Sequence, residues 1–245
     1  MSSHYESLYP LGLYPEAFGV PEPAIEVGRD VWPRKPAVFI RQVQAPQPAP
    51  VAGEPAEAAA PVEAKAVPHE LVAGQFGLVP RWVKSASDAK LRSTKLVNAR
   101  AETVTTSNNF REAWLAGQRC IVPLNAFFED DLRSGKPVPT RIARVDGKAM
   151  GVAGLWEHWE KDGETITSFT LLTINANSHA LLHRYGQPGA EKRMLAVLSE
   201  GTYDAWLSAR PEKAREFMRA YPANWLLANP VETKKPKVPA ALKGL

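Results

Sequence analysis

The chain has 245 residues, of which 44% are hydrophobic and 23% charged, a composition typical of a globular domain that can bury a full core. No run of about 18 apolar residues could span a membrane, and no secretory signal opens the chain, so we expect a cytoplasmic protein. Its one cysteine, Cys120, excludes a disulfide scaffold and a cysteine-rich zinc site, and we predict neither a metal nor another cofactor.

The formal net charge of +4 is unevenly distributed along the chain. Residues 229–245 contain four lysines and one glutamate, a net charge of +3, so the remainder keeps only +1. A local excess lies in residues 81–100, where six basic residues stand against one acid, Asp88. Such a stripe can follow a nucleic-acid backbone by releasing counterions, although an ordinary solvated face has the same composition.

Two segments are predicted to lie outside the folded body. Residues 45–68 hold nine alanines and six prolines, too little apolar surface to offset the entropy of ordering them. Residues 229–245 mix prolines with lysines and are expected to form a flexible tail. The prediction is one domain over residues 1–228, interrupted by a disordered Ala/Pro-rich insertion.

Short apolar runs predict strands within this body. In chain order they are residues 72–79, 120–123, 140–145, 150–156, 168–174 and 194–198. Asp146-Gly147 separates two of them and predicts a tight hairpin.

Helical signals are fewer. Asn108 or Asn109 could cap a helix over 110–116, helical spacing covers 202–209, and Pro211 can open a helix over 212–220. Many strands without regular alternation with helices predict an α+β fold around a curved, barrel-like and mostly antiparallel sheet. We expect most of the seven tryptophans to anchor its core.

Five sequence blocks follow one another in a specific order. They are QFGLVPRW at 75–82, NARAET at 98–103, RCIVP at 119–123 with FFE at 127–129, AGLWE at 153–157, and EKRM at 191–194. Together they resemble the SOS response-associated peptidase (SRAP) family of abasic-site processing proteins, over residues 71–207.

The resemblance implies binding of single-stranded DNA at abasic sites and reaction with the sugar aldehyde. In that family the initiator methionine is removed, and an N-terminal cysteine closes a stable ring that links protein to DNA. The same residue is held to perform autoproteolysis in members made with a leader. Chemically, an amine traps the aldehyde, a 1,2-aminothiol closes the imine into a thiazolidine, and acid/base groups move the protons.

The family's sugar-orienting asparagine matches Asn98, its phosphate-contacting arginine matches Arg100, its carboxylate matches Glu129, and the arginine of its Arg-Met pair matches Arg193. Arg81 and Lys95 of the basic stripe are further candidates for DNA contact. The alternatives are a turn with a surface charge at Asn98 and Arg100, and a solvent-facing loop acid at Glu129. Asp130 and Asp131 favour that second alternative, since the family usually has a tryptophan at position 130 and adjacent carboxylates repel DNA.

Two departures affect the predicted chemistry. Ser2 stands where the family has cysteine, and Cys120 cannot replace it because its block predicts a buried strand with an inert thiol. The acid/base histidine falls near Gly186 by comparison with long-loop members, whereas His183 or His179 is the nearest imidazole in this chain. Each histidine could equally be a structural side chain with a satisfied hydrogen bond.

We therefore predict a divergent SRAP protein that acts as a monomer on single-stranded or abasic-site DNA, associated with the nucleoid when bound. Its covalent linkage and autopeptidase activity are expected to be weakened or lost, with Ser2, Asn98, Glu129 and His183 as catalytic candidates. Two alternatives remain, namely a catalytically inactive DNA-binding pseudoenzyme and an interaction module built on the basic tail and the insertion.

Overall fold

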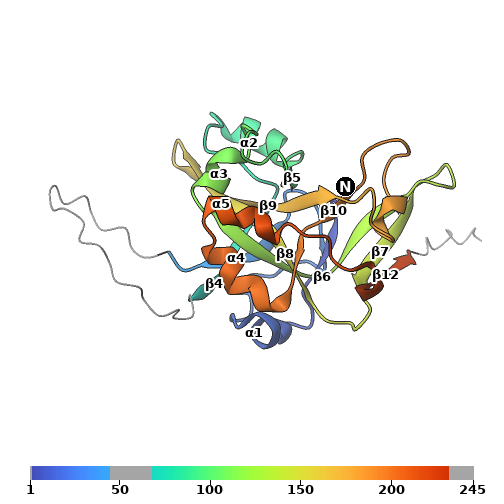
Figure 1. The fold of residues 1–245 in the computed structure, drawn as a ribbon. Helices are drawn as coiled ribbons and strands as arrows, with labels where there is room; N and C mark the ends of the chain where they lie inside the picture. The colour runs from blue at the N-terminus through green and yellow to red at the C-terminus, as the bar shows by residue number, and fades with distance from the viewer. Residues whose placement is uncertain (1, 45–67, 232–245) are drawn as a thin grey trace, which may run out of the picture.

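The computed structural model describes residues 2–44 and 68–231 (Figure 1). The strands are β1 Tyr5–Ser7, β2 Asp30–Val31, β3 Pro36–Gln42, β4 His69–Phe76, β5 Asn98–Arg100, β6 Arg119–Asp131, β7 Val138–Arg144, β8 Met150–Lys161, β9 Glu164–Asn175, β10 Arg193–Leu195, β11 Val197–Leu198 and β12 Leu226–Pro230. The α-helices are α1 Leu13–Phe18, α2 Ala86–Ser93, α3 Arg111–Leu115, α4 Tyr203–Ser208 and α5 Pro211–Ala214. Single 3₁₀ turns are η1 Leu182–Arg184, η2 Glu200–Thr202, η3 Arg215–Phe217 and η4 Ala223–Trp225.

Five strands close into a barrel. β8 pairs with β9, β9 with β4, β4 with β3, β3 with β6, and β6 again with β8. Only the β4–β9 pairing in this ring is parallel, and the remaining strands extend the sheet outside it. The predicted α+β fold with a curved, mostly antiparallel sheet is therefore confirmed.

The core lies inside the barrel and continues under the helices that cover its wall. β6 and β8 are buried along most of their length, because one face lines the barrel and the other packs against α3 and α4 (Figure 1). The indole of Trp206 in α4 donates a hydrogen bond to the carbonyl of Cys120 at 2.9 Å. Close packing requires glycine at Gly154, where a Cβ would lie 2.6 Å from the carbonyl oxygen of Thr170. Cys120 is fully buried, as expected, and burial raises the pKa of its thiol well above the ordinary value.

The predicted hairpin at Asp146-Gly147 is wrong. A turn does form there, since Gly147 N donates to Arg144 O, but β7 pairs with β6 and β12 rather than with β8. The tight hairpin joins β8 to β9 at Asp162-Gly163, where both residues have positive φ, 51° and 80°. This geometry is that of the two-residue turn that Asp-Gly favours.

The helix predictions are confirmed at α4 and at the Pro211 start of α5, which continues as η3. α3 also forms, but neither Asn108 nor Asn109 caps it, because Phe110 occupies the N-cap position. Four of the seven tryptophans are buried, namely Trp114, Trp156, Trp159 and Trp206.

The expectation of a disordered insertion falls almost entirely on residues 45–67, and that of a flexible tail largely on residues 232–245, which lie outside the described residues. Val43 N donates to Pro68 O at 2.9 Å, extending the β3–β4 pairing to both edges of the insertion. β12 runs to Pro230, two residues beyond residue 228. None of the helices within residues 2–44 and 68–231 is long and apolar enough to cross a membrane.

Candidate active site

Strand β1, near the start of the chain, pairs with β6. Tyr5 pairs with Phe127, and Phe128 N donates to His4 O at 3.1 Å. Because the strands are antiparallel, this register brings the residues before Tyr5 alongside Glu129 and Asp130. The Ser2 hydroxyl donates a hydrogen bond to Glu129 Oε1, and the two residues are 2% and 8% exposed.

Asn98 approaches the same point from β5, which lies parallel to β9. Its Nδ2 donates to the carbonyl oxygen of Ser2 at 2.8 Å. Its Oδ1 is buried and accepts no hydrogen bond from any described residue. The structure thus brings together Ser2, Asn98 and Glu129, which lie far apart in the sequence.

Glu129 is a buried strand residue, not a solvent-facing acid on a loop. Burial raises the pKa of its carboxyl above the ordinary value, although the hydrogen bond from Ser2 acts in the opposite direction. Of the neighbouring acids, Asp130 is exposed and Asp131 is engaged by Arg133, whose hydrogen bonds lower the pKa of Asp131 to about 2. A carboxyl with a raised pKa can release or accept a proton nearer neutral pH than an exposed one can.

The predicted histidines lie beside this cluster rather than in it. His179 Nδ1 accepts from the amides of Leu181 and Leu182, so Nε2 carries the proton and donates to Tyr221 O at 2.8 Å. Both ring nitrogens of His179 are thus engaged by the backbone. His183 is exposed, and its Nδ1 donates to His179 O at 2.8 Å.

The loop after His183 reaches the site through its backbone. Gly186 N donates to Asp130 O at 3.0 Å, and Gly186 lines a pocket of about 220 Å³ that also contains Glu129. The position that the resemblance gave for an acid/base histidine therefore does border the site, but it supplies no imidazole.

Sequence reasoning missed His4, which lines the same pocket. Its ring lies between Trp32 and Phe128, with centroid distances of 3.9 and 4.0 Å and nearly parallel planes. Its Nε2 lies 2.7 Å from Asp30 Oδ1. No sequence motif marks His4, because its contacts to Trp32, Phe128 and Asp30 are made by residues distant along the chain.

Arg100 and Arg193 both contact carboxylates. Arg100 Nη1 donates to Glu191 Oε2, and Arg193 Nη1 donates to Glu191 Oε1, each at 2.7 Å. Arg193 Nη2 also donates to Glu102 Oε2 at 2.7 Å. Hydrogen bonds from Arg193 and Asn175 lower the pKa of Glu191, which keeps its carboxyl charged at neutral pH.

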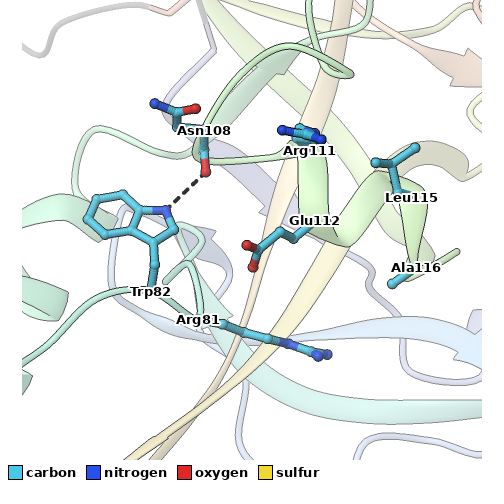
Figure 2. A pocket seen from close by; sticks show the side chains of 7 residues that line it. All are labelled: Arg81, Trp82, Asn108, Arg111, Glu112, Leu115 and Ala116. Atoms are coloured by element: carbon cyan, nitrogen blue, oxygen red, sulfur yellow. Dashed lines mark hydrogen bonds between the residues drawn. The ribbon is translucent and has the colours of Figure 1, made fainter.

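Arg81 and Lys95 lie elsewhere on the surface. Arg81 Nε donates to Glu157 Oε1 at 2.5 Å, and its side chain lines a pocket of about 710 Å³ together with Trp82 and Glu112 (Figure 2). The Trp82 indole donates to Asn108 O at 3.0 Å across this pocket (Figure 2). Lys95 is exposed after α2, and none of Ser2, Asn98 and Glu129 lines the Arg81 pocket.

Comparison with known proteins gives consistent matches. The profile of the family described as SOS response associated peptidase (SRAP) matches residues 19–238. The chain is 30% identical over 155 residues to the abasic site processing protein YoaM of Bacillus subtilis, covering 61% of this chain and 64% of YoaM. It is 31% identical over 124 residues to the abasic site processing protein YedK of Escherichia coli, covering 51% of this chain and 47% of YedK. The match thus spans less than two thirds of the length of these relatives.

Solved structures agree with the fold. A crystal structure of a protein from Bordetella bronchiseptica is 37% identical, with a TM-score of 0.79, and covers 94% of this chain and 100% of that one. A second crystal structure, of a protein from Bacteroides thetaiotaomicron, is 25% identical with a TM-score of 0.61, and the match covers 71% of this chain and 76% of that one. Because the family profile matches nearly the whole described domain and the barrel is shared, the chain belongs to the SOS response associated peptidase (SRAP) family.

Proposed function

We propose that this protein binds single-stranded DNA at abasic sites and reacts weakly and reversibly with the opened sugar through Ser2. The observation that carries the proposal is the convergence of Ser2, Asn98 and Glu129 in one cluster, in which Ser2 and Glu129 are buried and Asn98 is half-buried. Relatives named abasic site processing proteins support the choice of substrate. Each of these groups comes from one chain, so we propose that a monomer is sufficient for the reaction. Because the proposed substrate is DNA, we propose that the reaction takes place at the cytoplasmic nucleoid.

The reaction begins at the α-amine of Ser2 once Met1 has been removed. With an expected pKa of about 7.7 to 8.0, this amine is partly neutral at pH 7 and can attack the C1′ aldehyde carbon. Proton transfer from nitrogen to oxygen gives a carbinolamine, and loss of water gives an imine. A thiol would then add to the imine carbon to form a stable ring, whereas the Ser2 hydroxyl would form an oxazolidine that water opens readily.

Glu129 is the group proposed to move protons at this carbon. As the acid it protonates the departing hydroxyl of the carbinolamine, and as the carboxylate it can then remove a C2′ proton. Removal of that proton expels the 3′-phosphate by β-elimination, which is the lyase step. Asn98 orients the sugar, because its Oδ1, which no described residue engages, can accept a hydrogen bond from a sugar hydroxyl.

His183 is proposed as a second proton carrier. Its Nδ1 is anchored to His179 O, which leaves Nε2 as the atom that can exchange a proton. The same loop contacts β6 through Gly186 and Asp130, close to Glu129.

The DNA strand is proposed to approach along the cationic side chains of the body. Arg100 is exposed two residues after Asn98 on β5, and Arg193 shares its Glu191 partner. Arg81 and Lys95 are proposed as further contacts to the DNA backbone, outside the site. Binding through these groups depends on counterion release and weakens as salt rises.

The test incubates the purified protein with abasic single-stranded DNA, with and without borohydride, which reduces an imine to a stable amine. We expect a trapped adduct that maps to the Ser2 amine by mass spectrometry. Asp130→Asn, a change at an exposed neighbour of Glu129, is the matched control for Glu129→Gln. Retained Met1, or trapping scattered over lysines, would instead indicate a DNA-binding pseudoenzyme.

A further inference from the structure

Glu191 joins the two arginines proposed to face DNA. One carboxylate oxygen accepts from Arg100 and the other from Arg193, and Asn175 Nδ2 donates to the second oxygen at 2.9 Å. The carboxylate therefore occupies the two guanidinium groups at the same time. A DNA phosphate needs the same planar N–H donors, so the two anions compete for them.

Glu191 thus bridges Arg100 and Arg193, and the two arginines differ in how many partners hold them. The Arg193 side chain is 3% exposed, and its Nη2 also donates to Thr173 O at 2.7 Å and to Glu102. The Arg100 side chain is 49% exposed, and Glu191 is the acidic residue it contacts among the described residues. An exposed ion pair of this kind contributes little and breaks easily, whereas the buried end has several partners.

The bridge borders the candidate active site. Asn98 and Arg100 are two residues apart on β5, so their side chains point to the same face, about 7 Å apart along the strand. Asn98 contacts Ser2, and Arg100 contacts Glu191. A strand bound with its sugar at Asn98 would therefore bring a flanking phosphate to Arg100.

We propose that Glu191 is an internal competitor for phosphate, which Arg193 holds in place and which DNA must displace from Arg100. The inference rests on the proposed function, because it takes Arg100 as a contact to the DNA backbone. It adds that affinity is set by the exchange of one carboxylate for one phosphate.

The test measures binding of a labelled single-stranded oligonucleotide that contains a tetrahydrofuran abasic analogue, which binds but cannot form an imine. We expect Glu191→Gln to bind about three- to tenfold more tightly at low salt. The slope of log affinity against log salt concentration should also be steeper, by about one additional counterion released on binding. The matched control is Glu200→Gln, which removes a glutamate that pairs with Arg144 at 2.5 Å outside this network. Thermal unfolding of each variant verifies that the fold is retained.

A double variant separates competition at Arg100 from a general charge effect. In an Arg100→Ala background, Glu191→Gln should lose most of its gain, because the contested donor is absent. An equal gain in Glu200→Gln, or a full gain without Arg100, would overturn the inference. If Arg100→Ala weakens binding while Glu191→Gln leaves it unchanged, this inference fails and the proposed function stands. If the protein does not bind the oligonucleotide, both fail.

Discussion

The Ser2 hydroxyl donates a hydrogen bond to the buried carboxyl of Glu129, although the two residues are 127 positions apart in the chain. The pairing of β1 with β6 creates this contact, and Asn98 completes it from β5. Three side chains from distant parts of the sequence therefore meet in one cluster.

The protein as it stands should form no heat-stable link to abasic DNA, and Ser2→Cys should restore one. Sulfur closes the imine into a thiazolidine that survives heating, whereas oxygen does not. Denaturing gels after heating measure the shifted band. A heat-stable band from the unchanged protein would contradict the prediction, and failure of Ser2→Cys would show that the loss extends beyond the nucleophile.

Glu129→Gln should lower the yield of borohydride-trapped adduct by at least about tenfold, because the amide cannot transfer a proton. Binding to the tetrahydrofuran oligonucleotide should change much less, since the neutral side chain keeps its shape. The Asp130→Asn control should leave both quantities within about twofold. An equal loss in both variants would show that the trapping depends on negative charge near the site and not on proton transfer by Glu129.

The stability of the protein should depend on pH through Glu129. Burial raises the folded-state pKa of this carboxyl above the ordinary 4.5. The stability that the protonated carboxyl contributes is therefore fully present below pH 4.5, and it is lost as the pH rises through the folded-state pKa. The melting temperature of Glu129→Gln minus that of the unchanged protein should therefore increase as pH rises from 4.5. A difference that falls over this range would contradict the assignment.

His183→Ala should reduce trapping, but less than Glu129→Gln, because the imidazole is exposed and outside the hydrogen-bonded cluster. His158→Ala is the control, since His158 contacts Thr167 on β9 and lines a different pocket. Equal yields of trapped adduct from the unchanged protein, His183→Ala and His158→Ala would leave Glu129 as the only side chain proposed to move a proton.

Deleting residues 232–245 should weaken binding to single-stranded DNA only about two- to threefold, whereas Arg100→Ala should cost more. The deletion starts after β12, whose Asn229 pairs with Arg141, so the sheet stays intact. Fluorescence anisotropy over a salt series measures both variants. Loss of binding on deletion, with Arg100→Ala unaffected, would make the tail the DNA-binding element.

The sequence by itself determined the family, most of the barrel strands and the inert character of Cys120. Ordered blocks and short apolar runs are local properties, so they are readable without the fold. The β8–β9 hairpin was also readable, since Asp162-Gly163 carries the same signal as Asp146-Gly147. Choosing between the two turns required strand pairing, which is a long-range property.

Only the tertiary structure decided the environments of the site residues. Ser2, Asn98 and Glu129 could be named from the resemblance, but their contact depends on β1 and β5, strands of three residues each that are too short for an alternating pattern to predict them. The occupation of Arg100 and Arg193 by Glu191 follows from the pairing of both β5 and β10 with β9. Burial and charge pairing arise from residues distant in sequence, and for that reason composition and spacing could not reveal them.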